Sequence, residues 1–350
     1  MAEQRVEGWR PDVLGDGYEQ LTLPLGADDE GEVVATLVRY RPKPRPWYEW
    51  PWKPRPAGEA SGTDVLYVHG WSDYFFNHEL AEFWAGAGAR FFALDLRKYG
   101  RSLRPGQTPG YITDLAAYDA DIEAALEAMG HGAPATRTST DAAAAASTRP
   151  LILLGHSTGG LTLSLWAARN PGRAAALVLN SPWLEFQGSR IGREALAPVV
   201  GWGARVNPMG PMPNVDLGFY TRTIAKEQDG EWEYSHEWRP DPSFRVYPAW
   251  LTAVLAGHAT VAAGIDVGAP VLTLLSARST IQPRWDDEMF SSDVVLVVDD
   301  IAERTLRLGP NVTVARIDGA LHDVFLSRRP VRDAAYGAIT RWLRGYAPSR

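Results

Sequence analysis

Apolar runs of strand length alternate with segments of helical periodicity along most of the chain. Short apolar runs are typical of buried strands, whereas apolar positions that recur every three or four residues indicate amphipathic helices. This pattern predicts eight strands, at residues 19–25, 33–41, 64–69, 89–96, 151–154, 175–181, 269–275 and 312–318. It also predicts helices at residues 77–88, 114–129 and 331–346, and a further helix that begins at Gly160.

The order of these elements predicts the class of fold. The first two strands flank the turn-forming sequence GADDEG at residues 26–31, which is typical of a β-hairpin. The later strands alternate with helices, and strands separated by helices pair in parallel, with the helices packed on both faces of the sheet. We therefore expect an α/β fold with a mostly parallel eight-stranded sheet, which the hairpin makes mixed.

Three segments break the alternation. In residues 183–268 prolines and aromatic residues replace it, so we predict a lid insertion there, above the active site, between the core segments 1–182 and 269–350. Residues 133–149 are of low complexity and predict a flexible loop. Residues 41–56 are rich in proline and tryptophan and predict a surface loop.

Composition and charge narrow the class of function. The formal net charge of −7 disfavours nucleic acid as a partner, because phosphate binding needs a basic surface. The chain contains no cysteine, which excludes disulfides, thiolate metal sites and cysteine nucleophiles. We expect a cytoplasmic protein with no integral membrane span, because the sequence has neither the apolar core of a signal peptide nor a run of about 18 apolar residues. It also lacks nucleotide-binding glycine loops and the zinc-binding sequence His-Glu-x-x-His, so we expect no cofactor and no metal.

The clearest chemical signal is a serine between two predicted elements. The sequence GHSTG at residues 155–159 follows an apolar strand and precedes a helix. A serine at the apex of such a turn lies in a strained backbone conformation and needs small neighbours, so that helix and strand can approach closely. We predict that Ser157 is a catalytic nucleophile at the carboxyl end of its strand. A glycine-rich turn with an incidental serine is the alternative interpretation.

A second signal follows the strand at residues 64–69. His69 and Gly70 end this strand, at the position where a serine hydrolase places half of its oxyanion hole. We predict that the backbone amides of Trp71 and Thr158 bind the negative oxygen of a tetrahedral intermediate, because backbone donors are fixed in place before the reaction. An ordinary glycine turn at the end of a strand is the alternative.

A serine nucleophile needs a base, and the base needs an orienting carboxylate. In the chain order serine, acid, histidine, the base follows the last strand, and among the seven histidines only His322 does so. His156 points away from the serine by its position in the turn. His236 and His258 lie in the predicted lid, where a solvated or packed histidine is expected.

The acid follows a less regular pattern. It is expected a few residues after the strand 269–275, where the sequence SARST carries no carboxylate. Counting back from His322, a carboxylate, a loop, a helix and the final strand begin at Asp293, as though residues 277–292 were inserted before the acid. We therefore predict Asp293 as the orienting residue, and expect Asp323 to shape the histidine loop. The alternative acids are Asp286, Asp287, Asp299 and Asp300.

Together these motifs resemble the α/β-hydrolase superfamily, and within it the monoglyceride lipase, lysophospholipase and serine aminopeptidase-like (S33) group. The resemblance rests on YVHGW at residues 67–71, ALDLRKYGRS at 93–102, GHSTGG at 155–160 and GALHDVF at 319–325. It covers the chain from about residue 19 to 346, except the low-complexity loop and the lid. It implies an α/β-hydrolase fold with Ser157, His322 and an aspartate as the catalytic triad, although the acid lies further along the chain than in the family pattern.

The expected function is hydrolysis of carboxylic esters through an acyl-enzyme, in which His322 takes the proton of Ser157. The 14 tryptophans, some of them in the predicted lid, favour a small-molecule substrate with an apolar acyl or aryl group. Aminopeptidase or amidase activity, thioester hydrolysis and acyl transfer are alternatives, because the same triad catalyses all of them. A ligand-binding protein that keeps the fold without catalysis is a second class of function.

Overall fold

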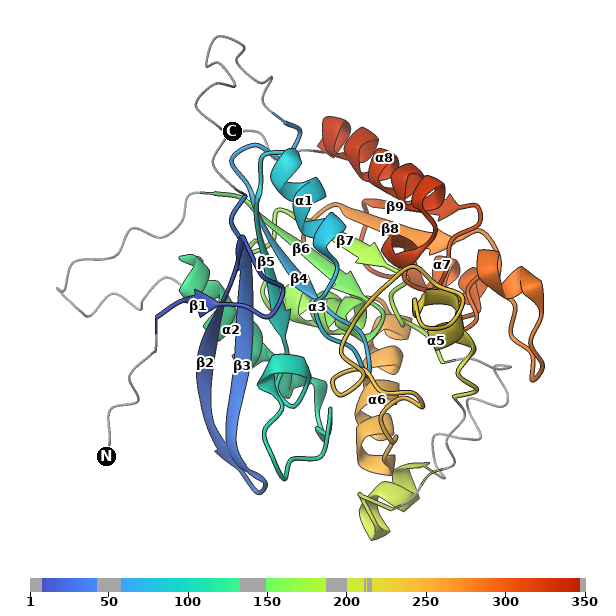
Figure 1. The fold of residues 1–350 in the computed structure, drawn as a ribbon. Helices are drawn as coiled ribbons and strands as arrows, with labels where there is room; N and C mark the ends of the chain where they lie inside the picture. Colours follow the sequence, from blue (N-terminus) through green and yellow to red (C-terminus); the bar gives the residue numbers. More distant parts are fainter. Residues whose placement is uncertain are drawn as a thin grey trace, which may run out of the picture.

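A nine-stranded β-sheet forms the centre of the protein in a computed structural model (Figure 1), which describes residues 8–42, 58–132, 149–186, 200–210, 212 and 216–346. The strands are β1 (Arg10–Pro11), β2 (Tyr18–Asp28), β3 (Gly31–Tyr40), β4 (Asp64–Val68), β5 (Arg90–Asp95), β6 (Leu151–His156), β7 (Ala176–Asn180), β8 (Val271–Ser276) and β9 (Val312–Ile317). Their order in space is β1-β2-β3-β5-β4-β6-β7-β8-β9. The loop predicted at 133–149 lies outside the described residues apart from Arg149, as do residues 43–56 of the proline-rich segment.

The strand pairing is mixed, as the sequence predicts. β2 and β3 form an antiparallel hairpin, and β3 also pairs antiparallel with β5. From β5 through β4 to β9, all neighbouring strands are parallel. The sheet has one strand more than the eight predicted, because β1 pairs with the edge of β2 over only two residues. A strand of that length leaves no hydrophobic pattern in the sequence.

Helices cover both faces of the sheet (Figure 1). They are α1 (His78–Gly86), α2 (Tyr118–Met129), α3 (Thr158–Arg169), α5 (Phe219–Ile224), α6 (Pro248–Ala263), α7 (Val298–Thr305) and α8 (Arg329–Tyr346), with short 3₁₀ helices η1 (Gly100–Ser102), η2 (Leu115–Ala117), η3 (Asp287–Ser291) and η4 (Val324–Leu326). α1 and α8 pack on one face, whereas α2, α3 and α6 pack on the other. Among the described helices, none is both long and apolar enough to cross a lipid bilayer.

Alternate residues of the central strands belong to two separate apolar cores. In β6, Leu153 packs in the core that contains α2, α3 and α6, whereas Ile152 and Leu154 pack in the core beneath α1 and α8. All three side chains are fully buried, and burial of a side chain of this size stabilises a fold by about 1.5–3 kcal/mol. Burial on both faces explains why the strand reads as a continuous apolar run.

The helices begin close to the predicted positions. Asn77 caps α1 by accepting a backbone amide at 3.0 Å. Asp114, the first residue of the predicted helix 114–129, caps the 3₁₀ turn η2, and α2 begins only at Tyr118. α3 begins at Thr158, two residues before the predicted start at Gly160, because Thr158 and Gly159 are themselves helical.

The segment predicted as a lid contacts the core at several points. Its last helix, α6, lies on the crossover from β7 to β8, and Trp250 and Val254 of α6 belong to the same apolar core as Leu153. Nearer the middle of the segment, the Trp232 indole donates a 2.8 Å hydrogen bond to the Leu326 carbonyl in η4. The division of the chain into core and lid stays a prediction.

Candidate active site

Ser157 lies at the sharp turn between β6 and α3. Its backbone angles are φ 50° and ψ −117°, a sparsely populated conformation that costs a residue with a side chain about 1–3 kcal/mol. Two hydrogen bonds hold the turn: the Ser157 amide donates to the Asn180 carbonyl at 3.0 Å, and the Ser157 carbonyl accepts from the Trp183 amide at 2.9 Å. The serine is therefore fixed at the carboxyl end of β6.

Three glycines around this turn allow the helix to approach the sheet. A Cβ atom on Gly155 would lie 2.7 Å from the backbone of Gly160, and one on Gly160 would meet the chain after β7 just as closely. A Cβ atom on Gly159 would lie 2.4 Å from the carbonyl oxygens of Val68 and His69. A side chain at any of these positions would push α3 away from the strands, which is the reason the motif needs small residues there.

His322 joins Ser157 to Asp293. Its Nε2 lies 3.2 Å from the Ser157 Oγ, and its Nδ1 lies 3.0 Å from the Asp293 Oδ2. An ionised carboxylate only accepts hydrogen bonds, so Nδ1 carries the proton that it donates to Asp293, and the lone pair of Nε2 faces the serine hydroxyl. The structure thus brings together the three residues that the sequence predicts as nucleophile, base and acid.

Asp293 reaches this position because the chain makes an excursion after β8. Residue 293 pairs in parallel with Ser279, and its amide donates to the Arg278 carbonyl at 3.0 Å. Residues 280–292 therefore leave the end of β8 and return to it, as an insertion before the acid requires. The Asp293 side chain is fully buried, and its Oδ1 accepts two backbone amides at 2.8 Å.

The alternative acids lie in other surroundings. Asp286 caps η3, and Asp287 accepts a hydrogen bond from a neighbouring tryptophan indole. Asp299, beside Asp300 in the first turn of α7, pairs with Arg316 at 2.6 Å. Asp286, Asp287 and Asp299 are all exposed, so their carboxylates are solvated or bind local partners.

The peptide between Gly70 and Trp71 lies against the serine. A Cβ atom on Gly70 would lie 3.0 Å from the Ser157 Cβ, so this approach requires glycine. The His69 ring holds the peptide: Nε2 accepts the Leu96 amide at 3.1 Å, so Nδ1 carries the proton and donates it to the Gly70 carbonyl at 2.7 Å. The carbonyl and N–H of a trans peptide point in opposite directions, so this bond turns the Trp71 N–H away from His69.

Thr158 is the other predicted oxyanion donor. It is the first residue of α3, and the first amides of a helix have no acceptor within the helix and lie at the positive end of its dipole. Thr158 directly follows Ser157, and Trp71 directly follows the glycine that touches Ser157. The two predicted donors are therefore the residues that directly follow Ser157 and Gly70, and Ser157 and Gly70 lie against each other.

Asn180 is a functional candidate that the sequence motifs do not single out. It is fully buried at the end of β7, and its carbonyl accepts the Ser157 amide. Its side chain donates to the Asp323 Oδ1 at 2.7 Å and accepts the Val324 amide at 3.0 Å. Asn180 thus joins the nucleophile turn to the loop of His322, and Asp323 shapes that loop as predicted. The signal in the sequence is a polar residue at the end of an apolar strand.

His156 lies beside the nucleophile but points away from its hydroxyl. Its Nδ1 donates to the Asn180 carbonyl at 3.1 Å, and its Nε2 lies 3.9 Å from the Asp323 carboxylate. Burial lowers the pKa of His156 below its usual value, in spite of the nearby Asp323. The ring is therefore a neutral structural group at pH 7.

Aromatic side chains lie around the serine turn. The rings of Trp71 and Trp250 have centroids 3.8 Å apart, and Trp183 lies 6.1 Å from Trp250. The Tyr220 ring, from α5 in the predicted lid, meets the His322 ring edge-on at 5.4 Å. Apolar surface from both the core and the lid segment therefore borders the predicted triad.

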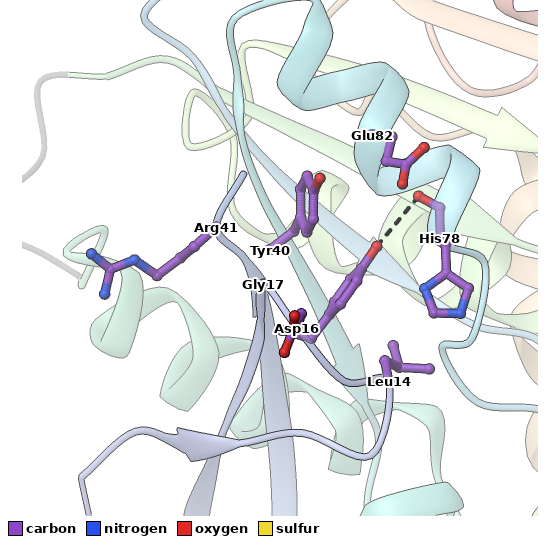
Figure 2. Close-up of a pocket in the computed structure, with 8 residues that line it drawn as sticks. Leu14, Asp16, Gly17, Tyr40, Arg41, His78 and Glu82 are labelled. Atoms are coloured by element: carbon purple, nitrogen blue, oxygen red, sulfur yellow. Dashed lines mark hydrogen bonds between the residues drawn. The ribbon is translucent and has the colours of Figure 1, made fainter. Parts of the chain in front are cut away.

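Two surface pockets lie away from these residues. One, of about 360 Å³, opens between α1 and the ends of β2 and β3 (Figure 2), and across it the Tyr18 hydroxyl donates to the His78 carbonyl at 3.4 Å. The other, of about 450 Å³, lies beside β8 and α7. Neither is lined by Ser157 or His322. Within the described ranges, no three His, Asp or Glu side chains are grouped to hold a metal ion.

Comparison with known proteins assigns the chain to a group. The family model described as serine aminopeptidase, S33, matches residues 60–246, more than half of the chain. Among curated proteins, a monoacylglycerol lipase of Mycolicibacterium smegmatis is 25% identical over 292 residues, which cover 82% of this chain and 90% of the lipase.

Two solved structures illustrate the fold. A monoacylglycerol lipase of Paleococcus ferrophilus has a TM-score of 0.56 and 21% identity, with 83% of this chain and 96% of the lipase covered. A soluble variant of the Saccharomyces cerevisiae monoglyceride lipase has a TM-score of 0.60 and 12% identity, with 99% and 97% covered. These likenesses show the α/β-hydrolase fold. With more than half of its length matched by the family model, the chain belongs to the serine aminopeptidase S33 family of α/β-hydrolases.

Proposed function

We propose that this protein is a serine hydrolase that cleaves carboxylic esters through an acyl-enzyme. The observation that carries the proposal is the 3.2 Å approach of the His322 Nε2 to the Ser157 Oγ, with Asp293 on the other ring nitrogen. An imidazole in this tautomer activates a serine hydroxyl as a nucleophile. The name of the relatives, monoacylglycerol lipase, supports an ester as the bond that is cleaved.

In this mechanism the proton moves from Ser157 to His322 and on to the leaving alcohol, and the acyl group moves from the substrate to Ser157 and then to water. His322 takes the proton from the Ser157 Oγ while that oxygen attacks the ester carbonyl carbon. The carbonyl oxygen becomes an oxyanion, for which the Trp71 and Thr158 amides are the donors. The bond to the alcohol then breaks, and the alcohol leaves with the proton from His322. A water molecule repeats the sequence on the acyl-enzyme, which releases the carboxylic acid and free Ser157.

The aromatic residues support an apolar substrate. Trp71, Trp183 and Trp250 form a cluster connected to the nucleophile turn through the Trp183 amide. An apolar acyl or aryl group can be buried against such side chains without loss of hydrogen bonds, whereas a charged group needs partners. We therefore propose small esters with an apolar acyl chain, such as the monoacylglycerols after which the relatives are named.

Hydrolysis of p-nitrophenyl esters from acetate to palmitate tests the proposal. We expect the wild type to be active and Ser157→Ala to lose about 10⁴-fold or more in kcat, since the nucleophile is gone. Ser291→Ala, at the surface of the excursion after β8, is the matched control and should keep full activity. The acyl length at which kcat/KM is highest then measures the acyl site.

A fluorophosphonate probe separates the ways in which the proposal could fail, because it labels an activated serine whatever the natural substrate is. A wild type that is labelled at Ser157 yet hydrolyses no ester would direct the search to amides, the bond to which the name of the matched family refers. A wild type that neither reacts with the probe nor hydrolyses any ester would contradict the proposal and favour a ligand-binding protein.

A further inference from the structure

The loop of residues 70–76, which carries the Trp71 amide, is held by the core at both ends. At its start, His69 donates to the Gly70 carbonyl. At its end, the Phe75 amide donates to Asp95 and the Phe75 carbonyl accepts from a buried arginine, both at 3.0 Å. The middle of the loop, residues 72–74, contacts a different part of the chain.

Three successive residues in the middle of the loop contact lid residues 235–244. The Ser72 Oγ accepts the Phe244 amide at 3.0 Å. The Tyr74 hydroxyl accepts the Ser235 amide at 2.7 Å. Between them, the Asp73 carboxylate faces an arginine of the same lid segment. Two hydrogen bonds and one ion pair therefore connect the loop of the predicted oxyanion donor Trp71 to the lid segment.

The partner of Asp73 is Arg239. Its Nε lies 3.1 Å from the Asp73 Oδ1, and only 7% of Arg239 and 4% of Asp73 are exposed. The guanidinium lies over the rings of Tyr220 and Tyr234, at 5.0 and 4.9 Å from their centroids. Water does not screen a buried ion pair, so removal of one partner leaves an uncompensated buried charge. Such a charge strongly favours rearrangement of the contact.

The backbone of Ser72 links the ion pair of Asp73 and Arg239 to Trp71, whose amide is a predicted oxyanion donor. Its φ of 51° is positive, and a residue with a side chain keeps such a conformation only where its surroundings hold it. Ser72 directly follows Trp71, so a change in its φ or ψ turns the Trp71–Ser72 or the Ser72–Asp73 peptide and displaces Trp71, the residue that carries the N–H. The lid contacts at Ser72 and Asp73 help to hold this strained residue.

We propose that Arg239 is a positioning residue for catalysis: through Asp73 and Ser72 it holds the Trp71 amide where the oxyanion forms. The lid segment is then part of the catalytic machinery and not only a cover over the site. This inference rests on the proposed hydrolase function. Because Arg239 contacts the loop and not the reacting atoms, its loss should weaken stabilisation of the transition state more than binding of the substrate.

Steady-state kinetics on p-nitrophenyl butyrate test the inference. We expect Arg239→Gln to lower kcat by about tenfold to a hundredfold while KM changes by less than about twofold, because a displaced oxyanion donor affects the transition state. The Ki of an alkyl trifluoromethyl ketone, whose adduct with Ser157 carries an oxyanion, should rise in parallel. Arg239→Lys keeps the charge opposite Asp73 and should recover part of kcat.

Two further variants separate positioning from folding. Arg332→Gln cuts another lid anchor, since the buried Arg332 pairs with Glu79 and Glu231 without contacting the loop 70–76. It should lower the melting temperature and leave kcat of the folded protein unchanged. The double variant Asp73→Asn with Arg239→Gln removes both charges, so it folds without a buried unpaired charge, and its kcat should match that of Arg239→Gln.

The inference is overturned if Arg239→Gln and the double variant, corrected for folded protein, keep the kcat and the inhibitor affinity of the wild type. It is also overturned if KM rises while kcat stays constant, since Arg239 would then contribute to substrate binding. A wild type that neither reacts with the fluorophosphonate probe nor hydrolyses any ester would instead overturn the proposed function, and this inference with it.

Discussion

At the scale of single residues, the two oxygens of Asp293 have different partners. Oδ1 accepts two backbone amides, whereas Oδ2 accepts the proton of His322 Nδ1. In Asp293→Asn the amide carbonyl can keep the two backbone contacts, but its NH₂ group faces Nδ1 and favours the His322 tautomer with the proton on Nε2. That tautomer cannot take the serine proton. We expect kcat for p-nitrophenyl butyrate to fall by about 10³–10⁴-fold with little change in melting temperature.

The other candidate acids provide the controls. Asp286→Asn and Asp299→Asn change exposed carboxylates that cap η3 or pair with Arg316. We expect both to keep the wild-type kcat, because neither contacts the histidine. Loss of activity in one of these variants, with activity retained in Asp293→Asn, would mean that the acid is not Asp293.

The candidate site residues that could be predicted from the sequence are those that can be placed by a short motif or by the order of the strands and helices. Ser157 and His322 lie in short motifs with fixed places relative to a strand, and Asp293 could be found by counting elements back from the histidine. Asn180 and Arg239 could not be found this way. Their partners, Asp323 and Asp73, are more than a hundred residues away in the chain, so only the folded structure reveals the contacts.

At the scale of elements, the packing of α3 on β4 depends on Gly159. A Cβ atom there would lie 2.4 Å from two carbonyl oxygens of β4 and the residue after it. These atoms are backbone, so in Gly159→Ala the helix or the strand end must move. We expect a loss of about 1–3 kcal/mol in the free energy of unfolding, measured in urea, together with a lower kcat because Ser157 and the Trp71 loop shift.

Gly86→Ala is the matched control for this substitution. Gly86 is the last residue of α1, and a Cβ atom on it would have open space within 4 Å. Alanine there should leave kcat unchanged and leave stability equal or higher by up to about 1 kcal/mol, because alanine favours helix. Equal effects of the two substitutions would contradict the role assigned to the contact between helix and strand.

Strands and helices could be predicted from the sequence where burial leaves a recognisable pattern of apolar residues. The central strands are buried on both faces and read as continuous apolar runs, so they could be placed to within one or two residues. β1 is too short to leave a pattern. α6 lies in the stretch predicted as lid and could not be recognised as a helix, because it is apolar all round and carries no amphipathic signal.

At the scale of the whole molecule, the prediction of an α/β-hydrolase fold is confirmed by the sheet order and the solved relatives. The alternation of strands and helices is enough to predict a parallel sheet, because parallel strands need crossovers on the faces of the sheet. How residues 216–247 pack could not be predicted in the same way. Their contacts depend on prolines, loops and buried charges, none of which has a period.

At the end of the sheet opposite the nucleophile, one buried carboxylate accepts hydrogen bonds from three other parts of the chain. Asp64, the first residue of β4, is fully buried and accepts hydrogen bonds from Arg90 at 2.7 Å, His131 at 2.8 Å and Arg149 at 2.6 Å. These donors come from β5, from the chain just after α2 and from the chain before β6. Burial by itself raises the pKa of Asp64, but the hydrogen bonds from the three donors outweigh it and hold the pKa below its usual value.

This depressed pKa makes the stability of the whole molecule depend on pH. The folded state binds the Asp64 proton more weakly than the unfolded state, so the carboxylate stabilises the fold above the unfolded pKa of about 3.9, and its contribution is lost as pH falls below it. Urea unfolding of Asp64→Asn at pH 7 should show a loss of about 3 kcal/mol, because three donors lose an ionised partner. The difference from the wild type should shrink between about pH 5 and pH 3.

The control for this prediction is Asp119→Asn, which breaks an exposed pair with Arg169 and should cost less than about 1 kcal/mol of stability. A difference for Asp64→Asn that stays constant down to about pH 3 would show that the side chain stabilises the sheet by its shape and not by its charge.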